Sequence, residues 1–198
     1  MKLLRTLAPV LAAAALCGCS VSSLLGGGSK IPPTLQTLTP EAADPGNTAR
    51  SAAAGQAVTI LAPLISNELN TVRVPVQVSP TEVQYVTDLQ WVDTPDKLFQ
   101  NLLEDTIRRT TNRVVLDASQ SGFDPGVTLH GQLERFGYDA QTGQVMVVYN
   151  GSMSTPSGVE SRRFVATAPA DGTGPSVGPA LNRAANQVAL EVAKWIGG

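Results

Sequence analysis

The clearest pattern in the chain is an alternation of apolar and polar residues that returns in several segments. In one of them the apolar residues occupy every second position: Val72, Val74, Val76 and Val78. A period of two is typical of a half-buried strand. Pro75 interrupts this strand, and because proline cannot donate a ladder hydrogen bond, it predicts a sheet edge or a bulge.

Further strands follow from the same reasoning. The apolar run 58–65 has the length of one strand, and 83–91 alternates with five residues predicted to face inward: Val83, Tyr85, Thr87, Leu89 and Trp91. Residues 114–117 predict a short strand, and a loop is expected at 121–126. The segments 127–134, 145–149 and 159–168 predict strands joined by turns at 139–143 and 155–158.

Two helices are expected. The first runs to Arg113 with Thr94 as its N-cap, Pro95 in the first turn and Asp96 near the positive end of the helix dipole. Its apolar residues recur at helical spacing: Leu98, Phe99, Leu102, Leu103 and Ile107. Arg108 and Arg109 lie near its negative end.

A Gly/Pro loop at 172–179 leads to the second helix. The buried stripe of that helix begins at Val177 or Leu181 and continues with four residues: Ala184, Val188, Val192 and Trp195. The order of elements is strands, a helix, four strands and a helix. We therefore expect an α+β fold with a mixed, largely antiparallel sheet and two main helices packed on it.

Composition narrows the class of function. The chain has 198 residues, of which 42% are hydrophobic and 15% charged, with one His and two Cys. So few ligating and titratable groups argue against most enzymes and against a metal or other cofactor. With 14 Lys+Arg against 16 Asp+Glu, the chain is not a basic nucleic-acid-binding protein.

The N-terminus predicts a bacterial lipoprotein signal at 1–18. Lys2 and Arg5 precede a short apolar run, which ends in Leu16-Cys17-Gly18-Cys19. This tetrapeptide resembles the lipobox, whose cysteine receives diacylglycerol and an N-acyl chain such as palmitate. Cys19 is the predicted lipidation site. Cys17 is the alternative, but Leu16 before it is larger than the usual residue at that position.

Acylation at Cys19 would leave the mature chain with no free thiol and no disulfide. Two or more acyl chains anchor a protein firmly to a membrane. Ser20 stands where inner-membrane retention usually requires Asp, so we expect sorting to the periplasmic face of the outer membrane in a Gram-negative bacterium. Residues 19–33 are predicted to be the lipidated cysteine and a flexible tether, because they are rich in Gly and Ser and end in a Pro pair.

Residues 34–198 are expected to form one α+β domain. It begins with a short strand at 35–38, and a loose stretch rich in Pro, Ala and Gly follows at 39–56.

For each candidate catalytic or phosphate-binding residue, the sequence favours a structural or surface role. His130 is the only histidine and lies on the polar phase of a predicted strand, which favours a surface position over a metal or triad role. The segment 172–178 has glycines before a helix, but Pro175 and the lack of Lys-Ser/Thr argue against a phosphate loop. Four carboxylates in or near turns indicate turn and surface roles rather than glycoside chemistry: Asp117, Asp124, Glu134 and Asp139.

Five arginines offer a candidate anion or head-group patch: Arg108, Arg109, Arg113, Arg162 and Arg163. The favoured interpretation is that they complement a helix end and cover a solvated strand face.

Several segments together resemble the ABC-type transport auxiliary lipoprotein family, the PqiC-like group. They are the lipobox, 72–76, the Trp91 segment 89–95 with the helix after it, Leu133-Glu134-Arg135-Phe136 and the Ala-rich last helix. The likeness covers most of 58–196. It departs from the family at 34–38, where the Tyr-x-Leu start is missing, and in the length of 39–56.

The resemblance implies a non-enzymatic lipoprotein that docks an assembly of MCE-domain proteins, an ABC permease and its ATPase at the outer membrane. The cargo would be phospholipid or another hydrophobic molecule. A ring of copies, a homo-oligomer, is part of this hypothesis. The alternatives are a lipoprotein that binds and activates a cell-wall synthase, a soluble-type lipid carrier and, least favoured, a hydrolase.

Overall fold

The sheet is organised around one long strand, β6 (Val127–Asp139). The structure, a computed structural model, describes residues 34–47, 49–124 and 126–197. The other strands are β1 (Val58–Ile60), β2 (Leu64–Ile65), β3 (Arg73–Ser79), β4 (Glu82–Gln90), β5 (Val115–Leu116), β7 (Gln144–Thr155) and β8 (Gly158–Pro169). The helices are α1 (Pro95–Thr110), the short 3-10 helix η2 (Ala118–Phe123) and α2 (Gly174–Gly197).

One edge of β6 carries three partners in succession, and the other carries one. β1, β2 and β3 pair with it in parallel, β5 adds to β1 in parallel, and β4 adds to β3 antiparallel. On the other edge, β6, β7 and β8 form an antiparallel meander. This mixed, largely antiparallel eight-stranded sheet with two main helices confirms the predicted α+β class.

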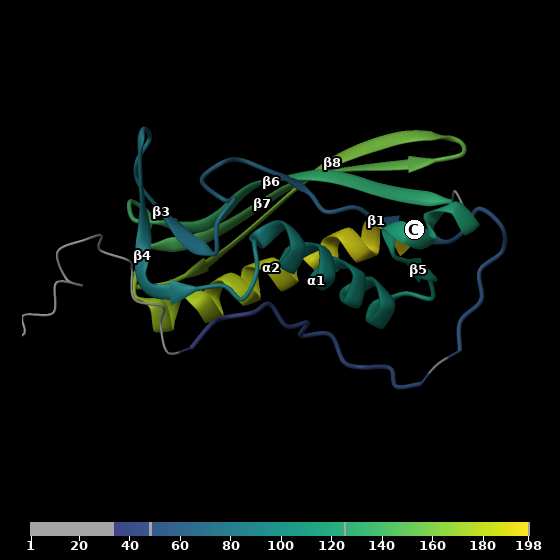
Figure 1. The fold of residues 1–198 in the computed structure, drawn as a ribbon, viewed down its shortest axis with the longest axis horizontal. Helices are drawn as coiled ribbons and strands as arrows, with labels where there is room; N and C mark the ends of the chain where they lie inside the picture. The colour runs from purple at the N-terminus through teal and green to yellow at the C-terminus, as the bar shows by residue number, and fades with distance from the viewer. Residues whose placement is uncertain (1–33, 48, 125, 198) are drawn as a thin grey trace, which may run out of the picture. The chain divides into compact units, whose positions relative to one another are not determined.

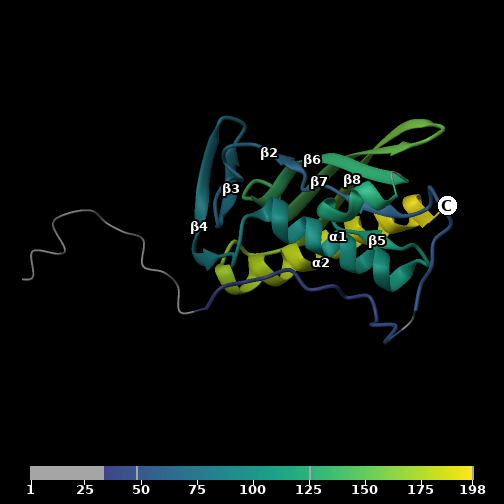
Figure 2. The ribbon, with the colours of Figure 1, turned by 45° about the vertical axis from the view of Figure 1, so that its right-hand side comes forward.

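Both helices lie on the same face of the sheet (Figures 1 and 2). The inward residues of β7 and β8 meet the apolar stripe of α2, which includes Val177, Leu181 and Val188. On β8 these residues become small after Phe164, since Ala166 and Ala168 follow it. Within the described residues, neither helix combines the length and the apolarity needed to cross a bilayer.

An extended segment crosses the helices on the side away from the sheet. We call it the strap (residues 34–47 and 49–56); it runs below α2 and α1 in Figure 1 before the chain turns up to β1. Only one isolated bridge, from Gln36 to Trp91, stands where a strand was predicted at 35–38. The strap has no other strand or helix, yet side chains of α2 and α1 bind its backbone.

Asn186 of α2 makes two of these bonds. Its Oδ1 accepts from the Glu41 N–H at 2.8 Å, and its Nδ2 donates to the Thr39 carbonyl at 2.9 Å. Asn182, one turn earlier, accepts from the Thr39 N–H at 2.9 Å, and Arg109 of α1 donates to the Ala42 carbonyl at 2.9 Å. Asn186 is 1% exposed, so a buried polar group is satisfied largely by the strap.

The apolar run 58–65 is not one strand, as was predicted, but two. β1 ends at Ile60 and β2 begins at Leu64. Pro63 lies in the gap and cannot donate a ladder hydrogen bond.

The inward phase predicted for 83–91 is wrong in its first part. Val86 and Leu89 are buried, whereas Val83 is 38% exposed and Thr87 is exposed. The cause is a bulge: between the pairs Arg73–Gln90 and Pro75–Tyr85, β3 has one residue and β4 has four. Asp88 takes a φ of 57° there, which shifts the alternation of the strand. The bulge predicted from Pro75 is therefore present, and its extra residues lie on β4.

Both helix boundaries and one loop also differ from prediction. α1 ends at Thr110, so Arg113 lies beyond it, and the Thr94 side chain makes no capping bond although Thr94 is the N-cap residue. η2 occupies the first half of the loop expected at 121–126. α2 begins at Gly174, inside the predicted Gly/Pro loop. Pro175 is tolerated because the first residues of a helix need no N–H partner.

Candidate functional site

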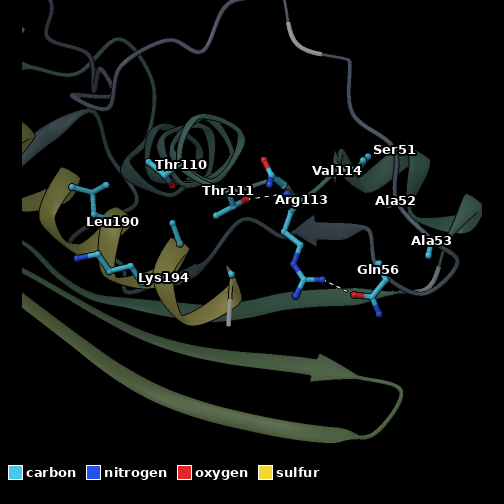
Figure 3. Close-up of a pocket in the computed structure, with 13 residues that line it drawn as sticks. Ser51, Ala52, Ala53, Gln56, Thr110, Thr111, Arg113, Val114, Leu190 and Lys194 are labelled. Carbon is cyan, nitrogen blue, oxygen red and sulfur yellow. Dashed lines mark hydrogen bonds between the residues drawn. The ribbon is translucent and has the colours of Figure 1, made fainter.

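A pocket lies between the C-terminal ends of α1 and α2 and the end of the strap (Figure 3). Its volume is about 630 Å³. The walls combine small apolar side chains with hydroxyl, amide and cationic groups: Ser51, Ala52, Ala53, Gln56, Thr110, Thr111, Asn112, Arg113, Val114, Leu190, Ala193, Lys194 and Gly197.

Arg113 fixes the geometry of this pocket. Its Nη1 donates to Gln56 Oε1 at 2.7 Å, the dashed contact in Figure 3, and its Nη2 donates to the Ile196 carbonyl at 3.2 Å. The second bond satisfies a carbonyl at the end of α2, which has no partner within the helix. Arg113 thus ties the strap to α2 and places a positive charge at the negative end of that helix.

Two threonine hydroxyls at the end of α1 bond to carbonyls of the same helix. Thr110 Oγ1 donates to the Thr106 carbonyl at 2.7 Å, and Thr111 Oγ1 donates to the Ile107 carbonyl at 2.8 Å.

Among the described residues that line the pocket, the charged ones are both positive. They are Arg113 and Lys194, and none of these thirteen residues has a carboxylate side chain. Lys194 is exposed, and no hydrogen bond or ion pair of its side chain is found within the described residues. The pocket can thus receive a carboxylate or another anion beside the apolar surface of Leu190 and Ala53.

The other sequence candidates do not converge on this pocket. His130 is exposed on β6, as its strand phase predicts. It borders a separate hollow with Leu61 and Leu64, and Leu64 is 75% exposed. Cys19, the predicted lipidation site, lies outside the described residues. In the described ranges no group of three His, Cys, Asp or Glu is placed to hold a metal ion.

The four carboxylates occupy turn and surface positions, as predicted. Asp117 accepts from the Ser119 N–H at the start of η2, and Asp139 accepts from the Gln141 N–H in a turn. Asp124 accepts from the backbone of Ala57 and of Gly55 and so closes the end of the strap. These bonds, that from Ala57 first, hold the pKa of Asp124 below its usual value.

Glu134 belongs to a polar network on the face of the sheet that the helices leave open. Arg163 of β8 reaches across β7 to both of its oxygens, and Asn150 Nδ2 donates to Oε2 at 2.9 Å. These hydrogen bonds, that from Arg163 first, lower the pKa of Glu134 to about 2.

The five arginines do not form one patch, because each has its own contacts. Arg108 pairs with Glu104 at 2.9 Å and with Asp105 at 3.2 Å, whereas Arg109 binds the strap. The guanidinium of Arg162 lies 5.2 Å from the centre of the Phe164 ring. Helix-end and strand-face roles therefore account for them, and Arg113 alone reaches the pocket.

Sequence reasoning missed most of the pocket. The helical period places Leu190, Ala193 and Lys194 near the end of α2, but it does not show which segment faces them. That segment is the strap at 51–56, and its residues carry no periodic signal. The polar Asn186 among the buried residues of α2, with Asn182 one turn before it, was the available sign that the backbone of another segment binds there.

Comparison with known proteins gives a family match and a fold match. A model of the family described as the ABC-type transport auxiliary lipoprotein component matches residues 37–193. No curated protein gives a significant match to the chain.

Several solved structures share the fold. The crystal structure of protein XCC0632 from Xanthomonas campestris, of the family DUF330, is 18% identical with a TM-score of 0.63, over 84% of this chain and 93% of that one. The crystal structure of an uncharacterized protein is 14% identical with a TM-score of 0.58, over 75% of this chain and 94% of that one. A PelC dodecamer from Paraburkholderia phytofirmans is 18% identical over 76% of this chain and 94% of that one; its TM-score of 0.46 is too low to support an argument.

Proposed function

We propose, from the premise that the chain belongs to the ABC-type transport auxiliary lipoprotein family, that it is a non-enzymatic docking component of an MCE/ABC transport system. In this role it sits on the periplasmic face of the outer membrane and receives the transport assembly, which moves phospholipid or another hydrophobic molecule. The observation that carries the proposal is the family match over 37–193, which spans nearly all the described residues.

The anchor of this component is a lipid on Cys19. The support is the lipobox sequence and the Gly/Ser-rich segment after it, whose composition suits a tether. Labelled palmitate should enter the wild-type chain and the Cys17→Ser variant, but not Cys19→Ser. Cys19→Ser should also leave the membrane fraction. Normal labelling of Cys19→Ser would overturn this assignment.

The contact with the assembly is made at the helix-end pocket. Its two cations without a carboxylate suit an acidic side chain of the partner, and Ala53 and Leu190 offer apolar surface beside it. Because Arg113 is already held by Gln56 and the Ile196 carbonyl, Lys194 is the cation that a partner can engage without opening the fold.

The test is affinity purification of the acylated full chain from solubilised envelopes, followed by mass spectrometry. We expect MCE-domain and permease subunits with the wild type and a loss of at least about fivefold with Lys194→Glu, about 1 kcal/mol for one exposed charge contact. Arg183→Glu is the matched control, because Arg183 is an exposed cation of α2 outside the pocket. Recovery of a cell-wall synthase, or of no transport subunit, would overturn the docking role.

A further inference from the structure

The outer edge of β8 is a long strand edge without a partner in the described chain. β8 pairs with β7 over twelve residue pairs, with no register shift between Gln144–Pro169 and Thr155–Gly158. Among the described strands, β8 has no other partner. A regular edge of this length is a template for another strand, and proteins that stay monomeric usually interrupt or cover such edges.

The backbone groups that face this edge can be identified. Ala170 N–H donates to the Gly143 carbonyl at 3.1 Å, and this pair continues the β7–β8 register. In an antiparallel ladder, hydrogen-bonded and non-bonded pairs alternate. Even-numbered residues of β8 therefore bond to β7, and the N–H and C=O groups of the odd-numbered residues from Val159 to Thr167 point away from the sheet.

Neither a proline nor a bulge interrupts the distal half of this edge. Residues 158–163 are all exposed, and no proline lies between 159 and 168. The two arginines there turn away from the edge: Arg163 lies across β7 to Glu134, and Arg162 lies over the Phe164 ring. Figures 1 and 2 show the tip of the β7–β8 hairpin pointing away from the helices, so a second strand has access to it. Nearer the helices, Trp195 Nε1 of α2 donates to Glu160 at 3.4 Å, so this carboxylate has one partner within the chain.

We infer that this edge pairs with the same edge of a second copy of the chain, antiparallel and centred on Ser161. Charge selects this occupant and this register. Centred on Ser161, the pairing sets Glu160 opposite the partner's Arg162 and Arg162 opposite the partner's Glu160. Directly opposite residues share a face of the sheet, so two unlike charge pairs form across the twofold axis.

The neighbouring registers are unfavourable. Those that keep the same hydrogen-bond phase are centred on Glu160 or on Arg162, and each sets like charges directly opposite one another. The register centred on Ser161 also joins odd-numbered to odd-numbered residues, which are the ones with free backbone groups. Hydrogen bonding thus allows all three registers, and charge selects the one centred on Ser161.

This contact is isologous and closes on itself as a pair. A ring would need a different, heterologous surface. β8 contributes no residue to the helix-end pocket, and the inference does not rest on the docking role.

Cysteine pairing tests the register. The full-length Glu160→Cys and Arg162→Cys chains are expressed separately and together, and their membranes are then oxidised. The parental chain measures the background of disulfide crosslinking through Cys17 and Cys19. Non-bonded cross-strand pairs lie about 4.5 Å apart at Cα, within disulfide reach. We expect a disulfide-linked pair when both variants are present and only background with either alone.

Charge reversal tests the contact without cysteine. Glu160→Arg should lower the association constant of the full chain in detergent by about tenfold, because two attractive pairs become repulsive. The double variant Glu160→Arg with Arg162→Glu should restore it. Glu82→Arg, on the exposed end of the β3–β4 hairpin, is the matched control and should have no effect.

Several outcomes would overturn the inference. Crosslinking of either single variant to itself would contradict the register. Crosslinks to a different protein would show that the edge serves another chain. Sedimentation of the unmodified full chain as a monomer at every concentration would exclude the pair, whatever the behaviour of the variants.

Discussion

The strap and β8 are both extended, but they differ in how the hydrogen-bonding groups of their backbones are satisfied. The strap has only one bridge of regular structure, and side chains of two helices bind its N–H and C=O groups. β8 is a regular strand of twelve residues, and the groups on one of its edges have no partner in the described chain. Regular secondary structure and a satisfied backbone are thus separate properties, and the second one indicates where another chain can bind.

The largest expected effect tests the two edges of β8. Arg162→Pro removes an N–H that bonds to β7, so we expect a loss of about 3 kcal/mol or more in the free energy of unfolding. Ser161→Pro removes an N–H that faces outward and should cost within about 1 kcal/mol. Urea unfolding of both full-length variants measures the difference. Equal losses would show that the alternation is assigned to the wrong residues.

The next effect tests the attachment of the strap. Asn186→Ala removes two hydrogen bonds to the strap, and at about 1 kcal/mol each we expect a loss of about 2 kcal/mol. Asn182→Ala is the matched control on the same helix and removes one backbone bond to the strap, so about half that loss is expected. Hydrogen exchange should rise at Glu41 in the first variant. Unchanged exchange there would contradict a strap held by Asn186.

The smallest effect tests the pair that holds Arg163 away from the β8 edge. The pKa of Glu134 is lowered to about 2 from an ordinary 4.5, so its contribution to stability is fully present above the ordinary value and is lost as pH falls towards 2. For this partly exposed pair we expect about 1 kcal/mol. Glu134→Gln should therefore be less stable than wild type by a constant amount above pH 5 and equal to it near pH 2.

A double-mutant cycle with Arg163→Gln isolates the pair. Without Arg163, the Glu134→Gln substitution should lose most of its pH dependence. A pH dependence that survives in the Arg163→Gln background would show that Asn150 or another group lowers the pKa of Glu134.

The class of fold was predictable because the apolar residues of β6, β7, β8 and α2 repeat with clean periods. The errors arose where local geometry interrupts a period. Pro63 divides one apolar run, and the left-handed residue Asp88 shifts the phase of β4. Pro175 and Gly178 suggested a loop, although the first turn of a helix accepts a proline.

The candidate site was harder to predict than the fold. Arg113 was selected from the sequence as part of a cationic cluster, but its role depends on Gln56, far away in the chain. The strap residues that close the pocket show no periodic pattern of apolar positions. Their position comes from side-chain bonds such as that of Asn186 to Glu41, which local patterns do not encode.

The bridge between Gln36 and Trp91 has a mechanical consequence. It is parallel, with Gln36 N–H bonded to the Gln90 carbonyl at 2.8 Å and Val92 N–H bonded to the Gln36 carbonyl at 2.9 Å. Tension applied at residue 34 meets these two bonds first and the Asn182 and Asn186 contacts next, before it reaches β1. We therefore expect a pulling force on residue 34 to detach the strap in steps, first at Gln36 and then at Asn182 and Asn186. The sheet and the two helices would stay folded during these steps.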